Sequence, residues 1–237
     1  MIKWIIRVAV AVVVLALLVE GATFVYIHFV EGPAPKKLTL PTSTSTTSKL
    51  PHAPPASFPA GTWSATSAST VGYRVNEVLF GQNNTAVGRT HSVTGAITLS
   101  GTEVSAATFT VRMATVHSDQ SQRDAQFDGR IMDVAAFPTS SFTLTSPIAL
   151  GSSTGTATAP GTTVKATATG NLTLRGQTHA VTFPVAASYT ATSIDVNGEI
   201  PVTFATWAIP NPGFSGITTD NHGTLEFLLV LHPSASS

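Results

Sequence analysis

From residue 61 onward, apolar and polar side chains alternate along one short segment after another. A period of two residues is typical of β-strands, because successive side chains point to opposite faces of a sheet. The pattern is clear at residues 109–113 and 181–189, and residues 224–231 form a last strand that is apolar on both faces apart from Glu226. We therefore expect seven or eight strands joined by short turns, which means a β-sandwich or a closed barrel.

Two glycines are expected to interrupt these strands. Residues 87–99 are predicted to form one long strand that is broken at Gly95. The dipeptide Asn197-Gly198 is predicted to be a turn that precedes the strand at residues 200–204, because Asn-Gly favours tight hairpin turns.

The width of such a barrel matters for function. A closed barrel of about eight strands is just wide enough to be filled by its own side chains or to hold one slender ligand. The inward rows are rich in Phe, Val and Leu, and a barrel interior is apolar with or without a ligand. The strand pattern therefore leaves a filled core and a pocket both open.

The alternation stops between Met113 and Ser146, and charge collects there. Six of the seventeen charged residues after residue 60 lie in these 34 positions. A β-domain that concentrates its charge in one insert either caps an opening or carries out chemistry there. Phe137-Pro138 is expected to end the insert before the next strand begins, because proline cannot continue a helix.

Four charged residues of the insert are expected to hold its shape: Arg123, Asp124, Asp128 and Arg130. Asp124 and Asp128 are four residues apart and share one face if the segment is helical. Two carboxylates on one face can serve acid–base chemistry or bind a cation. We favour the structural interpretation, in which the two aspartates are solvated or paired with Arg123 or Arg130.

The remaining composition argues against several classes of function. The formal net charge is zero and lysine and arginine are scattered, so no basic stripe exists to meet phosphates. Cysteine is absent, which excludes disulfides, thiolate metal sites and a cysteine nucleophile. No two histidines have the spacing of a metal motif, and no G-x-S-x-G nucleophile motif occurs. We therefore predict no catalytic residues, no metal, no cofactor and no nucleic-acid partner.

One enzymatic alternative stays open at this point. A hydrolase or a metal enzyme built on the insert would require four of its side chains to converge in a cleft. They are His117, Asp119, Asp124 and Asp128.

The N-terminus is predicted to be a transmembrane anchor over residues 1–30. Lys3 and Arg7 precede an apolar stretch that runs over residues 8–30 with an interruption at Glu20-Gly21, and 23 residues suffice for the ~30 Å hydrocarbon core. The leading positive charges predict a single-pass protein of the cell membrane with a cytoplasmic N-terminus and an extracytoplasmic barrel. A cleaved signal peptide is the alternative, because residues 8–19 alone have the length of its apolar region.

Residues 31–60 are predicted to be a linker. The stretch is rich in proline and contains the tract TSTSTTS at residues 42–48. It cannot bury enough apolar surface to offset its ordering entropy, so we expect an extended and mobile spacer between the anchor and a domain at residues 61–237.

Three stretches of this domain carry a family resemblance. They are GRTHSVTGAIT at residues 88–98, the insert with SQRD at 121–124, IMDVAAFP at 131–138 and SSFT at 140–143, and GNLTLRGQTHAVTF at residues 170–183. These stretches resemble the YceI-like family of exported, lipocalin-like, polyisoprenoid-binding bacterial proteins. Together they span about Trp63 to Leu231. The histidine that usually follows the family's first Phe-containing strand is absent from residues 78–84.

The resemblance implies an all-β, lipocalin-like antiparallel barrel of about eight strands with a short helical insert near one mouth. It implies a membrane-tethered protein that sequesters or carries a polyisoprenoid or another long-chain lipid, with the alternative of a stalk-displayed interaction module that has a filled core. The residues expected to contact the lipid are Phe109, Val111, Met113, Phe127, Ile131, Phe137, Phe142, Leu144, Phe183, Phe204, Leu225 and Phe227.

Overall fold

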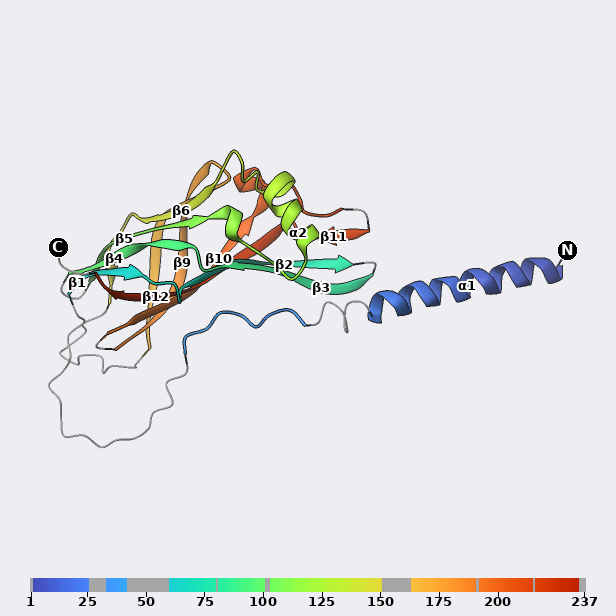
Figure 1. Cartoon of the computed structure of the whole chain (residues 1–237), viewed down its shortest axis with the longest axis horizontal. Coiled ribbons are helices and arrows are strands. Elements are labelled where there is room, and N and C mark those ends of the chain that lie inside the picture. The colour runs from blue at the N-terminus through green and yellow to red at the C-terminus, as the bar shows by residue number, and fades with distance from the viewer. Residues whose placement is uncertain are drawn as a thin grey trace, which may run out of the picture.

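The computed structural model describes residues 2–25, 33–41, 60–79, 81–100, 103–150, 163–190, 192–214 and 216–234. The first element is helix α1, Ile2–Val25, which projects away from the β-structure (Figure 1). At 1.5 Å per residue its 24 residues span about 36 Å, more than the ~30 Å of a bilayer core. Its residues 2–19 have a mean hydropathy of 2.6, so by length and composition the helix can cross a membrane. Residues 26–30 of the predicted anchor lie outside the described residues.

The rest of the described chain is mostly β-structure. The strands are β1 Gly61–Ala65, β2 Thr70–Leu79, β3 Gln82–Thr90, β4 Val93–Ser100, β5 Glu103–Arg112, β6 Thr139–Leu144, β7 Ile148–Ala149, β8 Val164–Leu174, β9 Gln177–Tyr189, β10 Ile194–Thr203, β11 Ile217–Thr219 and β12 His222–Pro233. The short helical elements are η2 Met113–Thr115, α2 Ser121–Gln126, the π-helix η3 Phe127–Ile131 and η4 Phe204–Trp207.

The sheet closes on itself. Its strand order is β1-β4-β5-β6-β8-β9-β10-β12, and β1 also pairs with β12, so the first and last strands of this series meet. The long strand β12 pairs with β2 over residues 224–228 and with β1 over residues 231–233, so β1 and β2 together occupy one strand position. All the pairings are antiparallel, and β3 and β4 share the next position in the same way. The predicted barrel of about eight strands with a short helical insert is therefore confirmed.

The two ends of the barrel differ (Figure 1). One end carries α2, η3, β11 and the tips of β2 and β3, and we refer to it as the α2 end. The other, the far end, carries β1 and the C-terminal part of β12. Helix α1 lies beyond the α2 end.

Both glycine predictions within the strands are wrong. The break in residues 87–99 falls at His91-Ser92, between β3 and β4, whereas Gly95 lies inside β4 with φ +136°. Gly198 lies inside β10, directly opposite Phe227 of β12. A Cβ on Gly198 would lie 2.6 Å from the Phe227 ring, so this glycine makes room for an aromatic side chain instead of forming a turn.

Residues 33–41 of the predicted linker contact the barrel, and whether the linker is mobile stays a prediction. These residues lie along the outer wall of the barrel without regular secondary structure. Arg74 Nη2 donates to the carbonyl of Pro35 at 2.6 Å, and Asn197 Nδ2 donates to the carbonyl of Leu38 at 3.1 Å. Lys37 forms an ion pair with Glu199 at 3.0 Å. The tract at residues 42–48 lies outside the described residues.

Candidate ligand-binding cavity

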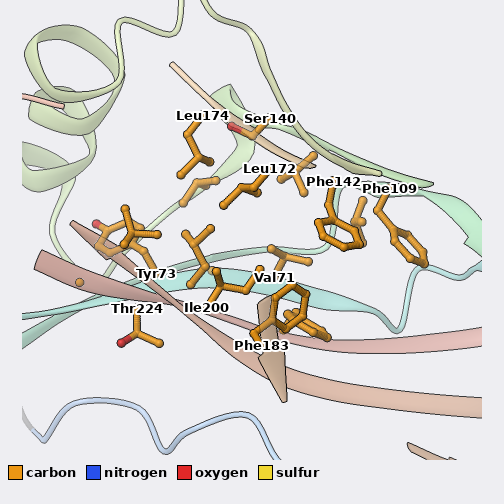
Figure 2. Close-up of a pocket in the computed structure, with 18 of the residues that line it drawn as sticks. Val71, Tyr73, Phe109, Ser140, Phe142, Leu172, Leu174, Phe183, Ile200 and Thr224 are labelled. Atoms are coloured by element: carbon orange, nitrogen blue, oxygen red, sulfur yellow. The ribbon is translucent and has the colours of Figure 1, made fainter. Parts of the chain in front are cut away.

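The barrel encloses a cavity of about 970 Å³. It is lined at the α2 end by residues such as Leu79 and Ile131 and at the far end by Leu99 and Tyr189, so it extends along the barrel. Figure 2 shows side chains from β2, β5, β6, β8, β9, β10 and β12 arranged around this space. Small-molecule pockets in proteins have volumes of about 300–1,000 Å³, so the cavity is large for a 177-residue domain.

Most of the predicted lipid-contacting residues line this cavity. Their even spacing along each strand places them on the inner face, as the alternation predicts. The structure places at the wall Phe109, Val111, Met113, Phe127, Ile131, Phe142, Leu144, Phe183, Phe204, Leu225 and Phe227. Whether these side chains contact a lipid stays a prediction.

Phe137 is the exception among them. It does not line the cavity. Its ring packs against the turn between β8 and β9, where a Cβ on Gly176 would lie 2.5 Å from it and the Arg175 guanidinium lies 5.8 Å from the ring centroid. Phe137 therefore fixes the end of the insert to a neighbouring hairpin instead of lining the cavity.

Several inward aromatic rings lie over a glycine of the paired strand. Phe227 lies opposite Gly198, and Phe109 lies opposite Gly95. A Cβ on either glycine would come within 3 Å of the ring. Because the glycine leaves that space free, each ring packs against the wall, and the middle of the barrel stays hollow.

Polar groups gather at the α2 end of the cavity. Glu77, Gln122 and Arg123 are among its lining residues, together with Tyr73. Burial raises the pKa of the Tyr73 phenol well above its ordinary value; the Arg123 charge opposes this effect, and the neighbouring carboxylates reinforce it. The wall is therefore apolar along most of its length and polar at one end, which suits an amphiphile with its head group at the α2 end.

Two hydroxyl groups of the lining have no hydrogen-bond partner within the described part of the chain. They are Ser140 Oγ and Thr219 Oγ1. Ser140 is 7% exposed, so its hydroxyl group is also largely shielded from solvent. Buried hydroxyl groups are usually satisfied, so these two can hydrogen-bond a polar group of a bound molecule.

The insert covers the α2 end through its apolar side chains. Phe127 of η3 stacks on Tyr73 of β2, with ring centroids 5.2 Å apart and an interplanar angle of 13°. Ile131 and Met132 also line the cavity. Asp133 adopts a left-handed conformation, φ +48°, and its N–H donates to the Gly129 carbonyl at 2.9 Å, which ends the helical segment.

The charges of the insert hold it in place, but with partners that the sequence did not indicate. Arg123 pairs with Asp119 and, at 3.2 Å, with Glu77 of β2. Arg130 donates to the carbonyls of Asn211 and Pro212 at 2.9 and 3.0 Å. The sequence had instead favoured the two aspartates at the i, i+4 spacing, Asp124 and Asp128, as solvated groups or as partners of these arginines.

Those aspartates have separate surroundings. Asp124 Oδ1 accepts hydrogen bonds from the backbone N–H and the hydroxyl of Ser118, at 2.8 and 2.7 Å. His117 Nδ1 lies 3.3 Å from Asp124 Oδ2, and its side chain is exposed. Asp128 Oδ1 is buried without a hydrogen-bond partner in the described residues. Asp124 thus shapes the start of α2, and within the described ranges no group of three or more His, Cys, Asp or Glu side chains could hold a metal ion.

Sequence reasoning missed part of the site. The far end of the cavity is lined by residues of β4 and β5, including Ile97, Leu99 and Val104. Their alternation was visible in the sequence and could have assigned them to the wall. Nothing in the sequence indicated that Tyr73 stacks on Phe127 of the insert.

Comparisons with known proteins agree on the fold. A family model described as the YceI-like domain matches residues 64–231. The structure of BcnA from Burkholderia cenocepacia is 18% identical with a TM-score of 0.52, and the match covers 70% of this chain and 98% of that one. A polyisoprenoid-binding domain from Saccharophagus degradans is 12% identical with a TM-score of 0.56, over 74% of this chain and 100% of that one. No curated protein sequence matches the chain.

Proposed function

Because the chain belongs to the YceI-like domain family, we propose that its barrel binds a polyisoprenoid or a similar long-chain amphiphile and sequesters or carries it without covalent chemistry. The observation that carries this proposal is the apolar cavity of about 970 Å³ that extends along the barrel. The similar fold of a polyisoprenoid-binding domain supports the choice of ligand class. A prenyl chain needs length and contact more than hydrogen bonds, and its burial contributes about 25 cal/mol per Å² before ordering costs.

The polar end of the cavity suggests how an amphiphile would lie. Its chain would extend along the apolar wall toward the far end, and its head group would lie near Tyr73 and Arg123. Ser140 and Thr219 would supply further hydroxyl groups on the cavity wall for polar groups of the ligand. The alternative of an interaction module with a filled core predicts a solid interior, and a cavity of this size counts against it.

The same proposal places the protein in the cell membrane. Helix α1 would be a single transmembrane anchor with its N-terminus in the cytoplasm, and the barrel would be extracytoplasmic. Cleavage of α1 as a signal peptide is the competing outcome. The intact mass of the protein recovered from the membrane fraction distinguishes them, since the tethered form retains residue 1 and the cleaved form loses the helix.

Lipid extraction tests the binding function. Residues 33–237 are purified without detergent, extracted with organic solvent and analysed by mass spectrometry, and the delipidated protein is then offered a polyprenyl phosphate. We expect a co-purified long-chain lipid or stoichiometric uptake of the added one. Reproducible absence of lipid together with no uptake would refute the proposal.

A further inference from the structure

Glu226 is an unusual residue on the outer wall of the barrel. It lies between inward-facing Leu225 and Phe227 in β12 and therefore points away from the cavity, yet it is only 1% exposed. An ionised carboxylate is costly to bury unless it is paired. Two arginines supply the pairing: Arg89 Nη2 and Nε donate to Oε1 at 2.7 and 2.9 Å, and Arg74 Nε lies 3.4 Å from Oε2.

Glycine at position 72 makes this arrangement possible. Gly72 of β2 lies between Arg89 of β3 and Glu226 of β12 in the cross-strand register. A Cβ at this position would lie 2.8 Å from the Arg89 side chain. Because Gly72 has no side chain, the Arg89 side chain can extend across the Gly72 backbone to reach Glu226.

The chain between the anchor and the barrel completes the cluster. We refer to residues 33–41 as the strap. The arginines that hold Glu226 also donate to strap carbonyls, Arg74 to Pro35 at 2.6 Å and Arg89 to Lys36. The strap carbonyls thus accept hydrogen bonds from arginines whose side chains are already oriented by Glu226. The position of the strap is therefore specified by the barrel wall.

A second charged contact extends the same cluster. Glu199 of β10 lies directly opposite Glu226 in the register, and like charges at such positions repel. Lys37 of the strap forms an ion pair with Glu199 at 3.0 Å. The strap therefore adds a cation beside Glu199, next to the two arginines that already pair with Glu226. Leu38 and Leu40 of the strap are half-buried.

The strap has a defined direction along the barrel. Arg74, which binds the Pro35 carbonyl, lies opposite Thr224 near the start of β12. Asn197, which binds the Leu38 carbonyl, lies opposite Leu228, four residues further toward the far end. The strap therefore runs from the α2 end toward the far end, as the blue segment in Figure 1 shows.

This direction fixes which end of the barrel is close to the anchor. The chain from Val25 to Pro33 reaches at most about 29 Å when fully extended. Ala22 of α1 is itself among the residues that line the cavity. The α2 end is therefore the end that faces the bilayer in which α1 lies.

The surface of the α2 end fits a bilayer. In the described part of the chain outside α1, the exposed large apolar side chains are Val78 and Phe214, which are 37% and 53% exposed. Both lie on this end: Val78 pairs with Thr218 of β11, and Phe214 pairs with Ile217. We refer to Val78 and Phe214 as the apolar rim. Phe214 also lines the cavity, so the rim is continuous with the interior.

We propose that the strap clamps the barrel with its α2 end against the membrane, and that Val78 and Phe214 enter the interfacial layer of the bilayer beside this end of the cavity. This inference rests on the proposed function, because it takes α1 as a retained anchor. The inference adds to the proposed function a fixed orientation of the barrel and a surface of the barrel that faces lipid. The partner of the rim is the bilayer that holds α1, and not a second protein.

Site-specific labelling tests the orientation in the full-length chain. The protein has no cysteine, so a single introduced cysteine carries a fluorophore at one known position. The chain is reconstituted into phosphatidylcholine–phosphatidylglycerol vesicles, and flotation shows that it is inserted. The labels are placed at V78C on the rim and at S100C, an exposed residue of the far end. We expect spin-labelled lipids to quench the fluorophore at V78C and not at S100C.

The strap is tested with a matched pair of variants. K37E/L38D alters the two strap positions that contact the barrel through the Lys37 side chain and the packed Leu38. K36E/T39D makes the same change in net charge at exposed neighbouring positions. We expect the first variant to reduce V78C quenching to the S100C level and the second to leave it unchanged.

The outcomes separate this inference from the proposed function. Equal quenching at V78C and S100C, or an unchanged signal in K37E/L38D, would overturn the inference while the lipid-extraction result stands. Lipid-free protein with the orientation intact would overturn only the binding function. If K37E/L38D unfolds, as its circular dichroism would show, N197A serves instead, because it removes only the donor to the Leu38 carbonyl.

Discussion

A single substitution on the cavity wall distinguishes a hollow barrel from a filled one. Ala166 of β8 lines the cavity and is only partly buried although it faces inward, so its methyl group borders open space. In A166F the ring would fill part of that space. Thr167, the next residue, is exposed on the outer face, and T167F is the matched control.

The sign of the stability change follows from the structure. Fully burying a phenylalanine side chain contributes about 1.5–3 kcal/mol, and ordering its rotamers removes up to about 1 kcal/mol. In a hollow barrel A166F should therefore raise the free energy of unfolding by about 1–2 kcal/mol. In a solid core the same ring would be overpacked and would lower it by about 1–3 kcal/mol.

The same ring should shorten the space available to a ligand. Excluding only two methylene groups of a lipid chain costs about 1.6 kcal/mol, which is more than a tenfold loss of affinity. We expect A166F to bind a long polyprenyl phosphate at least about tenfold more weakly and a short one nearly as well as the wild type. Urea denaturation and titration with polyprenyl phosphates of two lengths measure both effects in A166F and T167F. A destabilised A166F that keeps its affinity for the long chain would refute the hollow-barrel reasoning.

Three further predictions follow from individual contacts. In G198A the new Cβ would lie 2.6 Å from the Phe227 ring and push the ring into the lumen. We expect urea denaturation to show a free energy of unfolding lower by about 1–3 kcal/mol, and lipid uptake to be weaker. An unchanged free energy of unfolding and unchanged uptake would contradict the close approach of Gly198 and Phe227. Burial raises the folded-state pKa of Tyr73 above the unfolded value of about 10, so stability is lost as pH rises above about 10, by up to about 1.4 kcal/mol per pH unit. Y73F should lack this part of the loss of stability at alkaline pH. Parallel plots of the free energy of unfolding against pH for the two proteins, between about pH 9 and about pH 11, would show the interpretation to be wrong. R89A removes two of the hydrogen bonds to the buried Glu226 and should cost about 1–3 kcal/mol, whereas R89L/E226L should recover part of that loss, as a double-mutant cycle measures.

Features set by the backbone can be predicted from the sequence, whereas contacts between distant parts of the chain cannot. Strand alternation identified the inner face because a period of two is enforced by the backbone, and this holds from Phe109 to Phe227. The predictions at Gly95 and Gly198 are wrong because the role of a glycine in a strand depends on the residue across the sheet and not on its neighbours in the chain. Phe137 was predicted to contact the lipid, but it packs on Gly176, a tertiary contact that its position in the insert does not indicate.

The charged residues show the same limit. The sequence indicated that Arg123 holds the insert in shape, and the spacing pointed to aspartates within the insert as its partners. Its contact with Glu77 joins residues 46 positions apart, which no local pattern records. Likewise, Glu226 was visible as the one charge in an apolar strand, but the strap that contacts its two arginine partners comes from a segment whose composition predicts a mobile linker.

A cavity whose α2 end faces the bilayer also has a kinetic consequence. A lipid chain that crosses water exposes its methylene groups at about 0.8 kcal/mol each, so about twenty of them cost roughly 16 kcal/mol. Each 1.4 kcal/mol slows a step about tenfold, whereas movement from one apolar medium directly into another avoids this cost. We therefore expect K37E/L38D to slow the exchange of a fluorescent polyprenyl lipid between vesicles and the barrel while leaving the amount bound at equilibrium unchanged. The control K36E/T39D should exchange at the wild-type rate. Equal rates in all three proteins would mean that lipid reaches the cavity without contact between the α2 end and the bilayer, because the strap affects only the path and not the cavity itself.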